Sequence, residues 1–323
     1  MALRPSIATV GNFDGVHLGH RALVAAARSL VEEGRGERVV AMVFDPHPAE
    51  VLRPGMEPGR LSTFAQRSRW LRKVGADEVV RLDPWVKHAV PGSEPKGLLA
   101  LTPEEFVAWA QREHGVVGFV EGADFRFGKM RAGTVADLER LSGLARVVET
   151  VEVELPTGDR AAARSGVVRE LVEGGRVVEA ATVLGRAYEI EGTVVRGDRR
   201  GREIGFPTVN IQAPHLLPAD GVYAGVAELP DGRSAAAAIS IGVKPTFEGA
   251  HVRTLEAHLI GIGGPGRRIA QDEYGWTVRL TFAAWLRVQA KFAGLPELVA
   301  AIGDDCRRVT AIVGGSHAEM GTA

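Results

Sequence analysis

Two patterns of apolar and polar positions divide the chain. In the first half, short apolar runs alternate with segments whose apolar residues recur at helical spacing. That alternation is typical of a parallel sheet covered by helices. The expected strands cover residues 6–10, 39–44, 78–82 and 116–121, and the expected helices cover residues 21–31, 61–73 and 103–114. We therefore predict an α/β N-terminal domain with helices on both faces of its sheet.

From about Gly185 the pattern changes to short strands separated by glycine turns. Such strands with frequent turn signals predict an all-β domain. Residues 296–309 have the apolar pattern of a helix that packs on this domain, and residues 314–323 are expected to form a flexible tail. The predicted domains are therefore 1–184 and 185–313, followed by the tail.

Composition narrows the class of protein. The 323 residues are 45% apolar and 24% charged, which fits two globular domains with full cores. A formal net charge of -1 gives no general attraction to nucleic acid or to a membrane surface, so a phosphate ligand must be held locally. The single cysteine, Cys306, excludes an internal disulfide framework. Because neither a secretion signal nor a bilayer-length apolar run is present, we expect a cytoplasmic enzyme.

The first candidate site is the stretch between the first expected strand and the first expected helix. Glycines and polar residues fill it, and a strand–turn–helix junction offers free backbone N–H groups and the positive end of the helix dipole. It lacks the lysine of a P-loop and the glycine spacing of a dinucleotide fingerprint. His17 and His20 instead flank Gly19. The candidate phosphate-binding residues here are Gly11, Phe13, Asp14, Gly15, His17, Gly19 and His20.

Two other interpretations of these histidines stay open. A metal site would need a third ligand such as His47, which follows Asp45 and Pro46 at the end of a strand, but the zinc-helix motif is absent. Alternatively, the two histidines are simply exposed at the start of a helix. His47 itself either reaches the same end of the sheet or stands in water.

Another loop, Gly122–Arg131, follows the strand at 116–121. Its aromatic residues alternate with cations between two glycines, which suits a flat ring system beside a phosphate. A plain surface loop is the alternative. In the all-β half, the basic segment 196–202 contains Gly197 and Gly201 and either folds over a polyphosphate or forms a flexible hairpin.

The segment Gly205-Phe206-Pro207-Thr208-Val209-Asn210 comes next in the all-β half. Strand alternation places Thr208 and Asn210 on one face, where a hydroxyl and an amide oxygen can approach one Mg²⁺ ion. In a later strand, Glu256 points away from the apolar face formed by Leu255 and Ala257.

Together these motifs resemble the bifunctional riboflavin kinase/FMN adenylyltransferase family, over nearly the whole chain. The resemblance implies a Rossmann-like nucleotidyltransferase domain followed by a riboflavin kinase β-barrel. It implies that Glu256 is the catalytic carboxylate of the kinase and that His17 and His20 are the catalytic residues of adenylyl transfer. It also implies that Asp124 and Phe125 contact flavin and that Thr208 and Asn210 hold magnesium. The positions implied to bind ATP are Ser165, Arg169, Gly197, Gly201, Gly205 and Pro207, beside those of the first loop.

One motif departs from the family. Where members commonly have Ser-Ser-Thr-x-x-Arg, this chain has Arg164-Ser165-Gly166 and, after two valines, Arg169. Arg164 could replace the two lost hydroxyls with a guanidinium grip on phosphate. Equally, the adenylyl-transfer half could be weakened or lost.

The implied function is two-step synthesis of FAD: ATP phosphorylates riboflavin, and a second ATP adenylylates the resulting FMN with release of pyrophosphate. The expected ligands are riboflavin, FMN, FAD, ATP and Mg²⁺, without nucleic acid or membrane, and a homo-oligomer stays open. Two alternatives remain, namely a kinase whose adenylyltransferase half has degenerated, and a flavin-binding protein without turnover.

Overall fold

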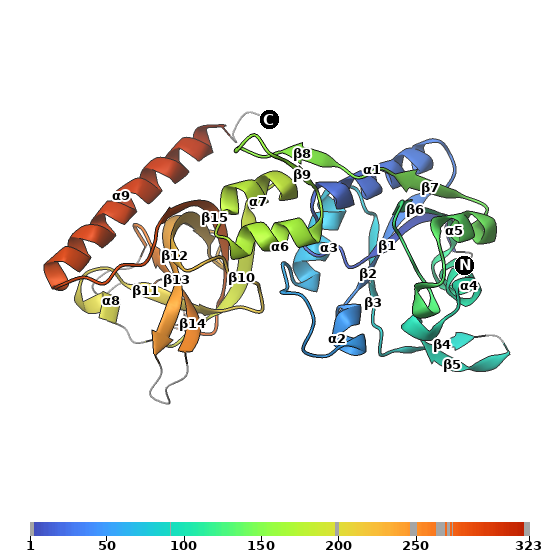
Figure 1. Cartoon of the computed structure of the whole chain (residues 1–323), viewed down its shortest axis with the longest axis horizontal. Helices are drawn as coiled ribbons and strands as arrows, with labels where there is room; N and C mark the ends of the chain where they lie inside the picture. Colours follow the sequence, from blue (N-terminus) through green and yellow to red (C-terminus); the bar gives the residue numbers. More distant parts are fainter. Residues whose placement is uncertain are drawn as a thin grey trace. The chain divides into compact units, whose positions relative to one another are not determined.

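The computed structural model describes residues 3–90, 92–197, 200–245, 251–262 and 274–319, together with residues 269 and 272. By its contacts the chain forms two compact units (Figure 1). The first comprises Met1–Val153 and Arg160–Ser165, and the second comprises Glu154–Asp159 and Gly166–Ala323.

A five-stranded parallel sheet forms the centre of the first unit, in the order β3-β2-β1-β6-β7. Its strands are β1 (Ser6–Gly11), β2 (Arg38–Phe44), β3 (Glu78–Leu82), β6 (Val116–Gly122) and β7 (Ala145–Val148). Smaller pieces are α2 (Pro48–Leu52), β4 (Lys87–Val90), β5 (Ser93–Gly97), β8 (Glu152–Glu154), β9 (Arg160–Ala162) and the 3₁₀ turns Leu98–Ala100 and Lys129–Arg131.

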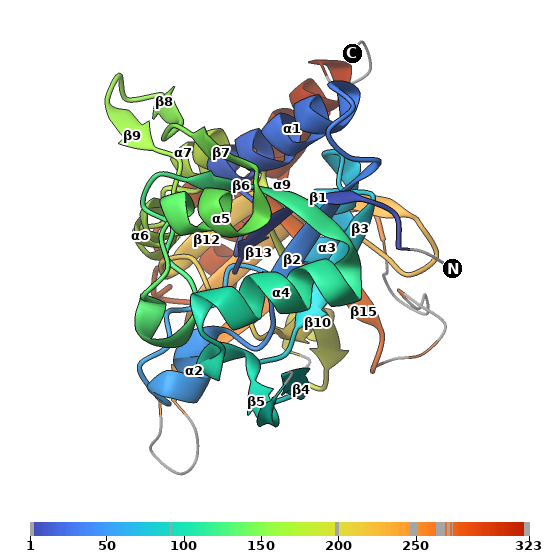
Figure 2. The ribbon, with the colours of Figure 1, turned by 90° about the vertical axis from the view of Figure 1, so that its right-hand side faces the viewer.

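Helices cover both faces of this sheet, as the sequence predicts (Figure 2). On one face, α1 (Leu18–Glu32) and α3 (Phe64–Lys73) pack on one set of strand residues. On the other, α4 (Pro103–His114) and α5 (Val135–Ser142) pack on the alternate set. Because parallel strands are buried on both faces, they appear in the sequence as continuous apolar runs.

The order of the strands fixes where the loops of this unit gather. β1 lies between β2 and β6. The chain adds β2 and β3 on one side of β1, and then β6 and β7 on the other side. The pairing of β1 with β6 ends at Ala8 and Phe119, before either strand does. In open α/β sheets, ligands bind beyond the carboxyl ends of the strands at such a reversal. The loops after β1 and β6 leave the sheet there.

In the second unit, six antiparallel strands close into a barrel in the order β10-β11-β14-β13-β12-β15. The strands are β10 (Tyr188–Val195), β11 (Thr208–Gln212), β12 (Gly221–Glu228), β13 (Ser234–Pro245), β14 (His251–Leu259) and β15 (Thr277–Arg287). The prediction of an all-β C-terminal domain is confirmed.

Helices extend this unit beyond the predicted boundaries. α6 (Ser165–Glu173) precedes α7 (Val177–Leu184), which lies against β10 and β15, so residues 166–184 group with the barrel by contacts although their sequence pattern belongs to the first half. After the short α8 (Arg200–Glu203), the chain ends in α9 (Leu295–Glu319). This last helix runs through Gly314 to Glu319, where the sequence predicts a flexible tail from residue 314.

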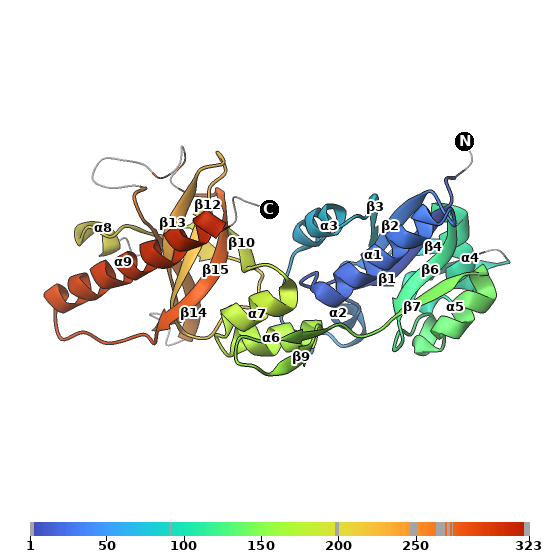
Figure 3. The same ribbon diagram turned by 90° about the horizontal axis from the view of Figure 1, so that it is seen from above.

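Apolar contacts and an ion pair fix the last helix to the barrel. α9 lies against β12, β13 and β15 (Figure 3), with Val309 and Val313 buried against Val222 and Leu286. The Nε of Arg287 donates to Oδ1 of Asp305 at 3.0 Å, and its Nη2 donates to Oδ2 at 2.6 Å. Only 4% of Asp305 is exposed, so this carboxylate depends on the guanidinium for its charge balance.

Asp305→Ala is expected to destabilise the barrel by about 3 kcal/mol, because it leaves the Arg287 guanidinium without its buried partner. Thermal unfolding of the full chain measures this effect. Asp304 offers a matched control, since its pair with Arg307 is exposed and Asp304→Ala should change stability by less than about 1 kcal/mol. Equal effects of the two substitutions would contradict the buried-pair assignment.

Candidate active sites

The loop between β1 and α1 holds an unusual backbone conformation. Phe13 has a φ of 50° and Val16 a φ of 41°, both in the left-handed region, as is Gly15 at 82°. A β-branched residue such as valine adopts this region only when its surroundings impose it. The loop is therefore held by contacts from outside itself.

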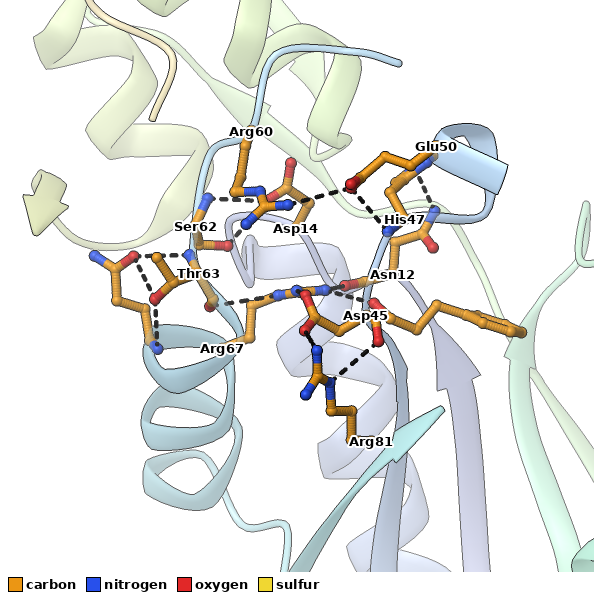
Figure 4. Close-up of polar contacts among 12 residues, drawn as sticks. Asn12, Asp14, Asp45, His47, Glu50, Arg60, Ser62, Thr63, Arg67 and Arg81 are labelled. Atoms are coloured by element: carbon orange, nitrogen blue, oxygen red, sulfur yellow. Dashed lines mark hydrogen bonds and ion pairs between the residues drawn. The ribbon is translucent and has the colours of Figure 1, made fainter. Parts of the chain in front are cut away.

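The Asp14 carboxylate is one of these supports (Figure 4). It accepts hydrogen bonds from the backbone N–H of Leu61 at 3.0 Å and of Ser62 at 2.9 Å, and from the Ser62 hydroxyl at 2.9 Å. The same hydroxyl accepts from the N–H of Gly15 at 2.8 Å. Asp14 is only 6% exposed, so its side chain is occupied in fixing the loop to the segment before α3.

Arg67 on α3 provides a second support, also drawn in Figure 4. Its Nη1 donates to the carbonyl oxygens of Asn12 at 2.7 Å and Phe44 at 2.8 Å, which joins the ends of β1 and β2. Its Nη2 donates to Oδ1 of Asp45 at 2.6 Å, and Oδ2 of Asp45 pairs with Arg81. Burial lowers the pKa of Arg67 and the charge of Asp45 opposes that shift. The buried guanidinium therefore depends on Asp45.

His17 and His20 lie together at the start of α1. Nδ1 of His17 accepts the His20 N–H at 3.3 Å, which caps the helix, and the two rings stack with centroids 3.6 Å apart. Since Nδ1 is an acceptor, the proton of the neutral His17 ring is on Nε2. A Cβ at Gly19 would lie 2.7 Å from the Ala163 carbonyl oxygen and 3.1 Å from the His17 ring, so only glycine fits.

Phe13 and His47, which the sequence analysis also considered for this region, have structural contacts of packing and capping: Phe13 lies in the core and His47 caps a helix. The Phe13 ring is 1% exposed and belongs to the core, with its centroid 5.0 Å from that of His20. His47 caps α2 through Nδ1, which accepts the Ala49 N–H, and its Nε2 lies 2.8 Å from the Asn12 side-chain amide. His47 thus reaches the loop. Within the described ranges, no three histidine, cysteine or acidic side chains are grouped to hold a metal.

The loop after β6 combines an exposed acid with one half-buried and one buried phenylalanine ring. The Asp124 side chain is 82% exposed. Phe125 packs on the core, and its ring stacks on that of Phe127 with the ring centroids 5.9 Å apart. Oδ2 of Asp124 lies 3.9 Å from Nη2 of Arg164, and the Ser165 hydroxyl donates to the Asp14 carbonyl oxygen at 2.8 Å. The structure therefore brings together residues from three separate predicted motifs.

Glu121 is a residue that the sequence analysis missed. It ends the apolar run of β6, is 2% exposed, and its Oε1 accepts the Val10 N–H at 2.6 Å. This bond replaces the ladder pairing that β1 and β6 lose beyond Ala8. Burial raises the pKa of Glu121 well above its ordinary value, and the hydrogen bond from Val10 opposes the shift only in part. An acid at the end of an apolar strand was the available signal.

In the barrel, alternation places the predicted kinase residues as expected on the outer face. Val209 and Ile211 are buried, while Thr208 is exposed and Asn210 half-buried. Asn210 of β11 is paired directly with Glu256 of β14. Residues paired in this way have Cβ atoms about 5 Å apart on the same face. The amide oxygen and the carboxylate therefore share one surface of the barrel.

The remaining predicted residues of the second unit surround β11 or lie on α6. A Cβ at Gly197 would overlap the Asn210 side-chain amide, and one at Gly201 would overlap the Phe206 carbonyl, so both glycines permit close packing of this segment. Gly205 and Pro207 lie just before β11, where Nδ1 of His258 is 2.8 Å from the Pro207 carbonyl oxygen. Arg169 is half-buried on α6.

Comparison with known families assigns each half of the chain. Residues 1–160 match the FAD synthetase family and residues 184–313 match the riboflavin kinase family. The bifunctional riboflavin kinase/FMN adenylyltransferase of Escherichia coli strain K12 is 33% identical over 309 residues, covering 93% of this chain and 90% of that protein. The chain belongs to this bifunctional family. It is a transferase with a riboflavin kinase domain and an FAD synthetase domain.

Further relatives agree over the same span. The family member of Bacillus subtilis strain 168 is 31% identical over 312 residues, which cover 93% of this chain and 90% of that one. A crystal structure titled as a macrolide-efflux protein from Streptococcus pneumoniae has a TM-score of 0.76 and 28% identity, covering 95% of this chain and 94% of that chain. Among the described residues, none of the helices has the length and apolar character needed to cross a membrane.

Gly19→Ala should lower FAD formation by about tenfold to a hundredfold, because its Cβ must displace Ala163 or the His17 ring and so misplace the loop. Conversion of FMN and ATP to FAD measures the effect. Gly303→Ala is the control, since a Cβ there meets only the end of the Arg307 side chain at 3.8 Å. Full activity of Gly19→Ala would refute the close-approach argument.

Glu121→Gln should stabilise the protein increasingly as the pH rises. Below the ordinary pKa of 4.5, Glu121 is protonated in both the folded and the unfolded chain and contributes no pH dependence. Above it, the unfolded carboxyl ionises before the buried one, whose pKa is raised, so the wild type loses stability that the neutral amide retains. Thermal unfolding midpoints at pH 4 and pH 8 measure the difference. A constant difference between the two proteins would contradict the raised pKa.

Proposed function

We propose that the two units divide the synthesis of FAD between them. The barrel phosphorylates riboflavin to FMN, and the N-terminal unit adenylylates FMN to FAD with release of pyrophosphate. One observation supports this division above the others: Asn210 and Glu256 are paired across strands within the residues that match the riboflavin kinase family. The stacked histidines lie within the residues that match the FAD synthetase family. We assign the domains to residues 1–184 and 185–313 accordingly.

In the kinase reaction, we assign Glu256 as the general base. It accepts the proton of the riboflavin 5′-hydroxyl while that oxygen bonds to the γ-phosphorus of ATP and ADP leaves. The pairing of Glu256 with Asn210, which we assign below to the magnesium ion of the nucleotide, supports this assignment. Gly197, Gly201, Gly205 and Pro207 shape the segment that covers the ATP phosphates.

Thr208 and Asn210 fit a magnesium ion that accompanies ATP. A hydroxyl and an amide oxygen are hard donors of the kind that Mg²⁺ takes, and both side chains stand on the outer face of β11. When bound, the ion neutralises charge on the phosphates. The packing of Gly197 against the Asn210 amide keeps that side chain in place, so that its oxygen is positioned before the nucleotide arrives.

In the adenylyltransferase reaction, an FMN phosphate oxygen bonds to the α-phosphorus of ATP and the bond to the leaving pyrophosphate breaks. The nucleophile is already an anion, so no base is required. His17 donates from Nε2 and His20 donates beside it to phosphate oxygens, which stabilises the charge of the transition state. Gly11, Gly15 and Gly19 let phosphate approach the backbone, and Ser165 and Arg169 contact the triphosphate.

The other predicted residues of this site either support the loop after β1 or contact FMN. We assign Asp14 and Phe13 to the support of the loop, since the carboxylate is bonded to Leu61 and Ser62 and the ring is in the core. Asp124 and Phe125 are assigned to FMN, because the loop after β6 presents an exposed acid beside an aromatic ring at the same edge of the sheet.

Two substitutions separate the reactions. His20→Ala is expected to abolish FAD formation from FMN and to leave FMN formation from riboflavin unchanged, because it removes a donor from only one unit. Glu256→Gln should lower FMN formation by at least about a hundredfold and spare FAD formation from FMN. Chromatography of products from purified protein with ATP, Mg²⁺ and either riboflavin or FMN measures both.

Equal loss of both activities in either variant would overturn the two-site assignment. FMN accumulating without FAD in the wild type would show a kinase with a degenerate adenylyltransferase half. Flavin bound without consumption of ATP would show a binding protein instead of an enzyme.

A further inference from the structure

Arg164 stands where the sequence departs from its family. The residues before and after it, Ala163 and Ser165, both lie against the loop after β1. The carbonyl oxygen of Ala163 lies so close to Gly19 that a Cβ added to this glycine would be only 2.7 Å from it. The following hydroxyl, that of Ser165, donates to the Asp14 carbonyl oxygen at 2.8 Å. The Ala163 N–H also donates to the Val151 carbonyl oxygen at 2.8 Å. Arg164 therefore has a defined place beside the loop.

From that place its side chain reaches the other loop of the site. Nη2 lies 3.9 Å from Oδ2 of Asp124 and donates to the Thr150 hydroxyl at 3.3 Å. The guanidinium thus reaches the loop after β6 from a backbone segment that lies beside the loop after β1. Both loops leave the sheet at the reversal of strand order, where ligands bind in this class of sheet.

The contacts of the guanidinium are weak enough to be exchanged. The Arg164 side chain is 57% exposed and that of Asp124 is 82% exposed. A pair this open and this long contributes little to stability. A phosphate can instead accept two parallel N–H bonds from the planar guanidinium, which gives a stronger and better oriented contact.

We propose that Arg164 binds a substrate phosphate in the adenylyltransferase site and exchanges its contact with Asp124 for that phosphate. This inference rests on the proposed function. The phosphate belongs to ATP or to FMN, which present the same chemistry to a guanidinium. Arg164 thereby supplies a phosphate contact from the segment directly before α6.

Arg164→Gln tests the contact, with Arg164→Lys as the conservative variant. The glutamine should raise the KM for the phosphate-bearing substrate by about tenfold or more, because a charged hydrogen bond is lost. Lysine should recover part of the loss, since it keeps the charge without the bidentate geometry. A raised KM for ATP identifies the triphosphate, and a raised KM for FMN identifies the flavin phosphate. Unchanged KM values for both substrates would overturn the proposal.

Arg146→Ala is the matched control. Arg146 lies in the same unit and pairs on the surface with Glu33 at 2.9 Å, so its loss should change neither KM. FMN formation by the barrel, measured in the same samples, should stay unchanged in all variants and confirms that each protein is folded. Loss of FMN formation in Arg164→Gln alone would assign Arg164 a structural role and overturn the proposal.

A binding experiment tests the exchange with Asp124 independently of catalysis. Calorimetry with inorganic pyrophosphate should show weaker binding by Arg164→Gln. Asp124→Asn removes the competing carboxylate and should tighten binding about twofold to fivefold in the wild-type background. In a protein that already carries Arg164→Gln, Asp124→Asn should change pyrophosphate affinity by less. An equal effect in the two backgrounds would overturn the exchange.

The binding result also separates this inference from the proposed function. If the wild type formed no FAD but Arg164→Gln still weakened pyrophosphate binding, the catalytic assignment would fail and the phosphate contact would stand. If the wild type formed FAD and Arg164→Gln bound pyrophosphate and both substrates normally, only the role of Arg164 would fail.

Discussion

Strands β1 and β6 stop pairing at Ala8 and Phe119, and the N-terminal site depends on that divergence. Where the strands separate, the Val10 N–H loses its ladder partner, and the carboxyl of Glu121 takes that place inside the sheet. The divergence also frees the two following loops to stand at one edge, which is where a parallel sheet of this winding binds ligands. Backbone geometry thus creates the site before any catalytic side chain contributes.

The loop after β1 is kept in an unfavourable conformation by its surroundings. Positive φ angles at Phe13 and Val16 require compensation, and Asp14 and Arg67 supply it through bonds to backbone groups. Each of these side chains joins the loop to the α3 region, so a rigid scaffold defines the positions of His17 and Gly19. Buried polar groups of this kind stabilise a site only when all partners are present.

The barrel positions its residues by a simpler rule. Alternation along β11 places Thr208 and Asn210 outward, and antiparallel register sets Glu256 beside Asn210. Closure of the sheet removes exposed edges, so the outer face is stable enough to carry polar residues without cost to the core. Strand alternation and register alone thus set the face on which the residues proposed for the kinase reaction stand.

The sequence by itself determined the two fold classes, the strand–glycine–helix loop and the outward face of Thr208 and Asn210, because these follow from local periodicity. It also located the motifs that tie the chain to its family. Only the tertiary structure decided that Asp14 supports the loop, that Glu121 and Arg67 hold it, that Asn210 is paired with Glu256, and that Arg164 meets Asp124. These contacts join residues far apart in the chain, so they arise only once the order of the strands and the packing of the loops bring those residues together.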